Sequence, residues 1–228
     1  MTTIASTLQA VNARIAKAAE DVGRRASEIT LLAVSKTFDA ERVREAWLAG
    51  QTAFGENYVQ EALVKIHTLS DLPIQWHFIG PIQSNKTKLI AENFSWVHSV
   101  DRGRIAERLS RDRPESLPPL QICLQVNVSG EGSKSGVAPE QAAVLAASIA
   151  RLPRIQLRGL MAIPAATAYP GLQRSQFRRL RELLDQLEQK GLELDTLSMG
   201  MSHDLEAAIS EGATIVRVGT AIFGERSL

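Results

Sequence analysis

The fold is indicated first by Leu31-Leu32-Ala33-Val34-Ser35-Lys36-Thr37, a short apolar run followed by a serine and a lysine. An unbroken apolar run of this kind is typical of a parallel strand buried on both faces. Comparable runs recur along the chain, and each is separated from the next by a segment with helical spacing of its apolar residues. The predicted strands span residues 31–35, 52–55, 76–79, 96–100, 120–128, 157–163, 196–199 and 215–218.

Eight strand–helix units within 228 residues indicate an α/β protein of the TIM (β/α)8 barrel type. An extra N-terminal helix is expected over about residues 4–22, where Leu8, Val11 and Ile15 recur at helical spacing. An open doubly wound sheet is the alternative, but no glycine-rich dinucleotide fingerprint follows the first strand. The proline-rich stretch 114–119 is short enough to be a loop, so we expect residues 1–228 to form a single domain.

Composition excludes several classes of protein. The net charge of +1 gives no electrostatic case for binding nucleic acid or an anionic membrane. No apolar run approaches membrane-spanning length, and the N-terminus lacks the pattern of a signal peptide. The single cysteine, Cys123, lies in an apolar run and is predicted to be a core residue, while the four histidines show no zinc-like spacing. We therefore expect a cytoplasmic protein with no metal, no nucleic acid and no membrane partner.

Lys36 lies at the carboxyl end of its strand, which is the end where TIM barrels place their functional residues. A lysine amine forms a Schiff base with an aldehyde, and partial burial lowers the pKa of such an amine toward a nucleophilic form. The last strand is followed by Gly219-Thr220, whose backbone N–H groups suit a phosphate. An aldehyde and a phosphate in one ligand predict pyridoxal 5′-phosphate as the cofactor.

Three more residues complete the predicted cofactor site. Ser202, interpreted as the N-cap of the helix after the seventh strand, offers a hydroxyl and nearby N–H groups to the phosphate. Arg217 is expected to face the pyridine nitrogen, where its permanent charge keeps that nitrogen unprotonated and the ring a weak electron sink. Asn57 is placed to hydrogen-bond the phenolic oxygen of the ring. No residue is assigned as catalytic.

Each of these residues also has a structural interpretation. A lysine after a strand is commonly a solvated surface residue, and Ser202 suits a helix cap alone. Arg217 could pair with a carboxylate such as Glu56 or Glu225, and Asn57 could serve turn chemistry. Only the joint placement of these residues at one end of one barrel favours the cofactor site.

Two further features do not belong to the predicted site. His77, within the third strand, is predicted to be a hydrogen-bonded core histidine and not a base. The glycine-rich stretch 130–136 lacks the spacing of a Walker motif and is interpreted as a flexible loop. The alternative for this loop is an anion contact made by Lys134.

Five stretches in the same order along the chain carry a family resemblance: Ala33-Val34-Ser35-Lys36-Thr37, Phe54-Gly55-Glu56-Asn57-Tyr58-Val59-Gln60-Glu61, Trp76-His77-Phe78-Ile79-Gly80-Pro81-Ile82-Gln83-Ser84-Asn85-Lys86, Leu197-Ser198-Met199-Gly200-Met201-Ser202 and Val216-Arg217-Val218-Gly219-Thr220-Ala221-Ile222-Phe223-Gly224. With them the chain resembles the pyridoxal phosphate homeostasis proteins, single-domain barrels similar to the N-terminal domain of alanine racemase. The resemblance implies that Lys36 carries the cofactor, that Ser202, Gly219 and Thr220 bind its phosphate, and that Arg217 contacts the pyridine nitrogen. The chain departs from the family at two places, and neither removes a proposed ligand. His203 stands where the family usually has a small or acidic residue, and Phe38-Asp39 replaces the family's usual start of the first loop.

The resemblance implies a cofactor carrier that acts in intracellular vitamin B6 homeostasis and supplies apo-enzymes, without established catalytic turnover. The alternative is a pyridoxal phosphate-dependent enzyme similar to an amino-acid racemase. Such a racemase needs a second acid or base, which its relatives take from a tyrosine of an additional C-terminal domain. The sequence ends at Leu228, so we expect that domain to be absent and the protein to be a monomer. Of the two tyrosines, Tyr58 is predicted to pack, and the sixth strand lacks the lysine of a Schiff-base aldolase.

Overall fold

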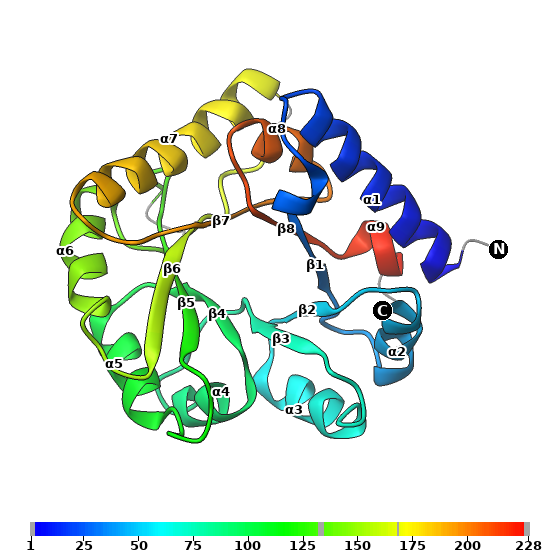
Figure 1. Ribbon diagram of the computed structural model, residues 1–228, viewed down its shortest axis with the longest axis horizontal. Coiled ribbons are helices and arrows are strands. Elements are labelled where there is room, and N and C mark those ends of the chain that lie inside the picture. Colours follow the sequence, from blue (N-terminus) through cyan, green and yellow to red (C-terminus); the bar gives the residue numbers. More distant parts are fainter. Residues whose placement is uncertain (1–2, 132–134, 168, 226–228) are drawn as a thin grey trace.

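Eight parallel strands close into one barrel in the computed structural model, which describes residues 3–131, 135–167 and 169–225 (Figure 1). Each strand pairs with the next along the chain, and the first also pairs with the last. The strands are β1 (Thr30–Val34), β2 (Ala53–Glu56), β3 (Gln75–Phe78), β4 (Trp96–Val100), β5 (Leu120–Gln125), β6 (Ile155–Met161), β7 (Thr196–Met201) and β8 (Ile215–Val218). The predicted barrel is confirmed, and the open-sheet alternative is wrong because β1 and β8 are hydrogen-bonded neighbours.

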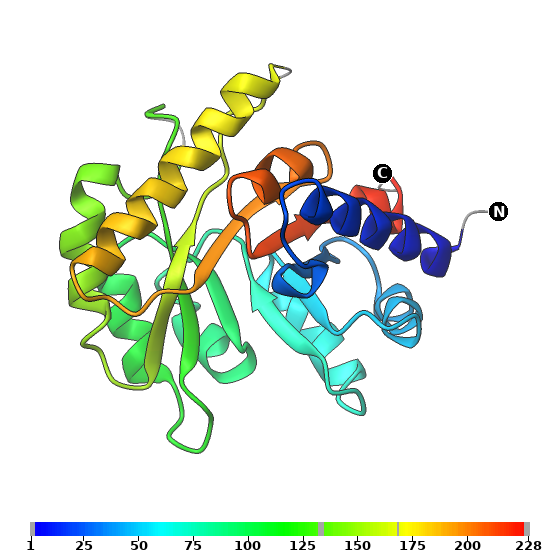
Figure 2. The same ribbon diagram turned by 45° about the horizontal axis from the view of Figure 1, so that its top comes forward.

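Helices cover the outside of this barrel, and Figure 2 shows the long α7 in yellow extending past the strands beside it. They are α1 (Ile4–Glu20), α2 (Ala40–Leu48), α3 (Val59–Thr68), α4 (Thr87–Asn93), α5 (Gly103–Asp112), α6 (Pro139–Ile149), α7 (Pro170–Gln189), α8 (Leu205–Ser210) and α9 (Thr220–Phe223), with a 3₁₀ turn at Ala26–Glu28. The predicted strand boundaries agree with these to within two residues, except that the fifth strand was predicted to reach Val128 and ends at Gln125. Beyond it, Val126 makes only an isolated bridge to Val137. Lys134, the alternative anion contact, lies outside the described residues.

The predicted N-terminal helix is present as α1 and covers the barrel between β8 and β1 (Figure 1). Helices α2 to α8 each follow one strand, whereas within the described residues only the four-residue α9 follows β8. The apolar face of α1 fills this position with Leu8, Val11 and Ile15, all buried. Its attachment is also polar, since the Thr7 hydroxyl donates to the carbonyl oxygen of Ile222 at 2.8 Å. An ordinary amphipathic helix therefore completes the outer ring.

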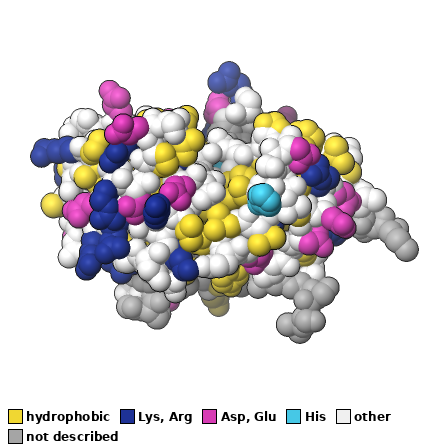
Figure 3. Space-filling model, turned by 90° about the horizontal axis from the view of Figure 1, so that it is seen from below, with side chains coloured by type: hydrophobic (Ala, Val, Ile, Leu, Met, Phe, Trp, Pro, Cys, Tyr) yellow, Lys and Arg dark blue, Asp and Glu magenta, His cyan; other side chains and the backbone are white. Residues whose placement is uncertain are grey.

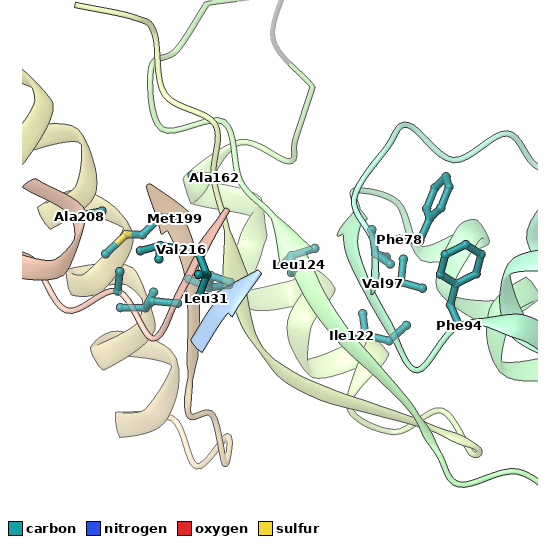
Figure 4. Close-up of a cluster of buried hydrophobic side chains, with 14 of the residues drawn as sticks. Leu31, Phe78, Phe94, Val97, Ile122, Leu124, Ala162, Met199, Ala208 and Val216 are labelled. Carbon is teal, nitrogen blue, oxygen red and sulfur yellow. The ribbon is translucent and has the colours of Figure 1, made fainter. Parts of the chain in front are cut away.

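The main hydrophobic core lies between the outer face of the strands and the helices. Figure 4 shows part of this layer, and Phe78 and Phe94 in it meet edge to face with ring centroids 5.3 Å apart. Along β1 the alternate residues Leu31 and Ala33 join this layer, while Leu32 joins a second, smaller cluster. Because side chains alternate across a strand, the smaller cluster marks the barrel interior.

The interior of the barrel is only partly apolar. Its hydrophobic cluster is small and comprises Leu32, Ala53, Trp96, Cys123, Met161 and Ile215. Buried polar side chains fill other positions of the barrel, among them His77 on β3, His98 on β4, Ser198 on β7 and Arg217 on β8. Barrel interiors are usually dominated by branched apolar residues, so this polar content distinguishes the region below the carboxyl-end opening.

Candidate functional site

A cavity of about 240 Å³ opens at the carboxyl ends of the strands, and all six residues predicted to bind the cofactor line it: Lys36, Asn57, Ser202, Arg217, Gly219 and Thr220. They come from three neighbouring strands and the turns that follow them, β1, β2 and β8, and from the turn after β7. The volume lies just below the roughly 300–1,000 Å³ typical of pockets for drug-sized ligands, so it suits a small one. The apolar side chains of Val34, Phe38, Ile79, Ile163 and Met201 also line it, and His203 and Gly224 complete the lining.

Lys36 is half-buried in the turn between β1 and α2, and a buried network fixes this turn from behind. Lys65 of α3 donates hydrogen bonds to the carbonyl oxygen of Ser35 at 2.7 Å, to Glu56 Oε1 at 2.7 Å and to Glu61 Oε1 at 2.6 Å. The Ser35 hydroxyl also donates to Glu56 Oε1, at 2.6 Å. An ammonium group has three donors, and all of those of Lys65 are used. The backbone on which Lys36 stands is therefore anchored on both sides.

Asn57 faces the cavity with an unused polar atom. Its Oδ1 is buried and has no hydrogen-bond partner among the described residues. A buried polar atom without a partner is unfavourable, so this amide is prepared to meet a ligand. Gly80 fixes its backbone by close approach, since a Cβ at Gly80 would lie 2.1 Å from the Asn57 carbonyl oxygen. Because an amide oxygen only accepts, Oδ1 fits the phenolic O–H of a pyridoxal ring.

Ser202 lies in the turn after β7, and its predicted role as an N-cap is wrong. The next helix, α8, begins at Leu205 after Asp204, whose carboxylate accepts the Met201 backbone N–H at 2.6 Å. The Ser202 hydroxyl is therefore not spent on the helix and remains beside the cavity. Arg14 of α1 holds this turn by donating to the Ser202 carbonyl oxygen at 3.0 Å, while the same guanidinium pairs with Glu206.

The turn after β8 supplies backbone donors to the same cavity as Lys36. Gly219 packs against β1, and a Cβ at this position would approach the Val34 carbonyl oxygen to 3.1 Å. Within the described residues, no hydrogen bond uses the N–H of Ser202, Gly219 or Thr220. Three unused N–H groups and one hydroxyl around the same opening form a cradle that fits a phosphate.

Arg217 forms the floor of the cavity and does not pair with either carboxylate considered from the sequence, Glu56 or Glu225. Its guanidinium donates to the Ser198 carbonyl oxygen at 2.6 Å, to Ser198 Oγ at 2.8 Å and to the Ala162 carbonyl oxygen at 2.9 Å. Burial lowers the pKa of Arg217 to about 10, so the group stays charged at neutral pH. Three of its five N–H donors are used, which leaves two for a ligand above it.

Several other predictions can be compared with the structure. Cys123 is fully buried in the core as predicted, and burial raises the pKa of its thiol to about 12. His77 is a buried, hydrogen-bonded histidine, also as predicted. The packing predicted for Tyr58 is wrong, because this side chain is 55% exposed and outside the cavity lining. In the part of the chain that the structure describes, no cluster of His, Cys, Asp or Glu could hold a metal.

Two residues near the site were missed from the sequence. Ser198 and His98 are buried directly beneath Arg217, and the Ser198 hydroxyl joins the two. The signal that could have found them is the alternation of side chains along each strand: His98 shares the inward phase of β4 with Trp96, and Ser198 lies between Leu197 and Met199, which join the outer core. A strand that is expected to be buried on both faces does not show which of its residues face the barrel interior, so neither residue stands out in the sequence.

Elsewhere on the described part of the surface, acidic and basic side chains are mixed. A wider hollow of about 660 Å³ lies on the flank beside α6 and α7, and its charged lining combines Arg179 with Glu140 and Glu182. Figure 3 shows one face on which acidic and basic side chains are intermingled. None of the helices in the described ranges has the length and apolar character needed to cross a membrane.

Known proteins share the fold of this chain and, in part, its sequence. Residues 7–227 match the family described as alanine racemase, N-terminal domain. The chain is 62% identical to a pyridoxal phosphate homeostasis protein from Pseudomonas aeruginosa, over 99% of this chain and 97% of the relative. It resembles the structure of PipY from Synechococcus elongatus with pyridoxal phosphate bound, at 39% identity and a TM-score of 0.81 over 92% of this chain and 100% of PipY. Alanine racemase from Corynebacterium glutamicum shares the fold, at 17% identity and a TM-score of 0.69 over 97% of this chain and 62% of the racemase.

The fold and the cavity define a class: parallel (β/α)8 barrels of the alanine racemase N-terminal type, with a lysine after the first strand. Within that class, the chain belongs to the pyridoxal phosphate homeostasis protein family.

Proposed function

We propose that this protein binds pyridoxal 5′-phosphate as an internal aldimine on Lys36 and acts as a carrier in vitamin B6 homeostasis and cofactor supply. The observation that carries the proposal is that one cavity is lined both by an amine and by the residues of a phosphate cradle. The cofactor brings a matching set of groups, namely an aldehyde, a phenolic oxygen, a ring nitrogen and a phosphate. PipY, a relative of known structure, has been solved with this cofactor bound.

The residues of the cavity divide the binding work among them. Ser202, Gly219 and Thr220 hold the phosphate through one hydroxyl and backbone N–H groups. Asn57 accepts a hydrogen bond from the phenolic O–H through Oδ1, which has no hydrogen-bond partner among the described residues. Arg217 donates an N–H to the ring nitrogen and, being charged, keeps that nitrogen unprotonated. The ring is then a poor electron sink, which suits storage of the cofactor better than turnover.

The lining also supports a carrier in preference to a racemase. A racemase needs an acid or base on the ring face opposite the lysine. Among the described residues, no tyrosine lines the cavity, and Tyr58 is exposed away from it. The imidazole that does line it, His203, lies beside Ser202 at the proposed phosphate cradle. We propose that residues 1–228 form one cofactor-binding barrel domain that passes the cofactor to apo-enzymes. The monomeric state and the cytoplasmic location of the protein stay predictions.

The test is borohydride reduction of the protein loaded with pyridoxal phosphate, followed by peptide mapping. We expect a visible band that disappears on reduction, with the label on Lys36, and we expect no band or label in Lys36→Ala. Lys88→Ala is the matched control, because Lys88 lies exposed on α4. A label that persists in Lys36→Ala refutes the assignment, and alanine racemisation at ordinary enzyme rates of about 1 per second or more refutes the carrier.

A further inference from the structure

A chain of hydrogen bonds runs through the barrel interior and ends on Arg217. Ser198 Oγ accepts from Arg217 at 2.8 Å and lies 2.7 Å from His98 Nδ1. His98 Nε2 lies 2.8 Å from His77 Nδ1, and His77 Nε2 lies 3.1 Å from Gln75 Oε1. These hydrogen bonds cross from β3 through β4 and β7 to β8, where Arg217 forms the floor of the cavity.

Its two ends fix the direction of every bond in it. A guanidinium can only donate, so Ser198 Oγ accepts from Arg217. Ser198 is fully buried, and among the described residues His98 Nδ1 is the one acceptor within reach of its hydroxyl hydrogen. His98 must then carry its proton on Nε2 and donate it to His77, and His77 donates from Nε2 to Gln75. The opposite direction would leave a buried hydroxyl hydrogen without an acceptor, which is unfavourable.

The chain is held rigidly and in neutral form. The His77 ring stacks on Trp96 with centroids 5.4 Å apart and an interplanar angle of 3°. The Arg158 guanidinium also lies over that indole, 5.2 Å from its centroid. Burial lowers the pKa of His77 to about 3, and burial also lowers the pKa of His98 well below 6.5. Both rings therefore keep the single tautomer that the bonding requires.

We propose that Ser198 and His98, supported by His77, are positioning residues that orient the Arg217 guanidinium toward the ring nitrogen of the bound cofactor. The inference rests on the proposed function, in which Arg217 meets that nitrogen. Arg217 donates to two backbone carbonyl oxygens and to the Ser198 hydroxyl. Of these three contacts, only the one to the hydroxyl depends on the hydrogen bonds through His98 and His77. Because His98 Nδ1 uses the hydroxyl hydrogen, the oxygen lone pair is directed to Arg217. The remaining N–H groups of Arg217 are then available to the cavity.

Two substitutions at His98 separate this role from packing. In His98→Gln the amide nitrogen replaces Nε2 and keeps the bond to His77, but the acceptor for Ser198 is lost. In His98→Asn the amide oxygen replaces Nδ1 and keeps the bond to Ser198, but the donor to His77 is lost. Ser198→Ala removes the hydroxyl itself. Cys123→Ala is the control, because Cys123 lies in the same interior and outside the chain.

Each variant is loaded with pyridoxal phosphate, and its visible absorbance maximum, the pH titration of that band and the dissociation constant are measured. We expect Ser198→Ala and His98→Gln to shift the band or its titration and to weaken binding at least three-fold. We expect smaller changes in His98→Asn and an unchanged band in Cys123→Ala. Equal spectra in all four variants, with only melting temperatures lowered, would show that the chain is merely structural.

A second measurement needs no variant, so it decides the matter even where a substitution prevents folding. Nitrogen-15 NMR of the wild-type histidine rings should show His98 protonated at Nε2 only. Pyridoxal phosphate should then shift the His98 ring resonances, whereas inorganic phosphate and the exposed His67 serve as ligand and residue controls. Unchanged His98 resonances in protein that does form the Lys36 imine overturn the inference, while failure to form that imine refutes the proposed function instead.

Discussion

Lys65 donates a hydrogen bond to the backbone carbonyl oxygen of Ser35, at 2.7 Å, one residue before the proposed covalent partner of the cofactor. The side chain of Lys65 is only 4% exposed, and its partner Glu56 is fully buried. A buried lysine from α3 thus holds the backbone at the end of β1, and it couples the stability of the barrel to the position of Lys36.

Lys65→Met is expected to weaken both folding and cofactor binding. Removing the ammonium leaves the Glu56 carboxylate buried without its partner, so the free energy of unfolding should fall by about 3–5 kcal/mol. The Ser35–Lys36 turn also loses its anchor, and borohydride should then trap less cofactor on Lys36. Urea denaturation and the borohydride assay measure the two effects. Lys88→Met, at an exposed pair with Glu92, should change stability by less than about 0.5 kcal/mol. Wild-type stability in Lys65→Met would contradict the assigned role.

Arg14→Ala tests whether α1 contributes to the site. Arg14 is 39% exposed, so its pair with Glu206 contributes at most about 1 kcal/mol to stability. Its bond to the Ser202 carbonyl oxygen orients the turn whose N–H and hydroxyl face the cavity. We expect a several-fold weaker affinity for pyridoxal phosphate in a fluorescence titration, with little loss of stability. Arg44→Ala removes a comparable exposed ion pair, with Asp71, far from the cavity, and should leave the affinity unchanged.

The position of the site could be predicted from the sequence because it depends on chain order alone. Apolar runs that alternate with helical segments define a parallel barrel, and all residues that follow such runs meet at one end. Lys36, Asn57, Gly219 and Thr220 follow their strands directly, so their presence in one cavity needs no knowledge of side-chain contacts.

Contacts between distant elements could not be predicted in this way. The capping role given to Ser202 failed because Asp204, two residues later, precedes the helix and binds the turn instead. The Lys65–Glu56 pair depends on how α3 packs against β2, which no local pattern encodes. The bond from Ser198 to His98 spans 100 residues and arises only when the barrel closes.

Acid should destabilise this protein through its buried histidines. Burial lowers the pKa of His77 to about 3 in the folded state, against 6.5 for an ordinary histidine, and it lowers the pKa of His98 as well. Below pH 6.5 the unfolded chain therefore binds more protons than the folded one. The contribution of these histidines to the free energy of unfolding is fully present above this pH and is lost as the pH decreases toward 3. Each histidine adds a slope of about 1.4 kcal/mol per pH unit.

The comparison of variants isolates this effect from that of the carboxylates. Denaturation in urea between pH 7 and pH 5 should show a shallower loss of stability in His77→Gln than in wild type. His67→Gln should retain the wild-type slope, because His67 is exposed on α3. An identical slope in all three proteins would mean that the buried histidine does not titrate on unfolding.

Gly80→Ala should disturb Asn57 without touching any cofactor ligand directly. A Cβ at Gly80 would lie 2.1 Å from the Asn57 carbonyl oxygen and 2.7 Å from its Cα, and both are backbone atoms that cannot rotate away. The Ser99 hydroxyl holds Gly80 in place by donating to its carbonyl oxygen at 2.5 Å, so the strain must pass to Asn57. We expect a loss of about 1–3 kcal/mol in stability and a weaker affinity for pyridoxal phosphate. Gly171→Ala is the control, since nothing lies within 4 Å of its Cβ position and the substitution within a helix should be neutral or stabilising. Full cofactor affinity in a folded Gly80→Ala protein would show that Asn57 does not depend on this contact.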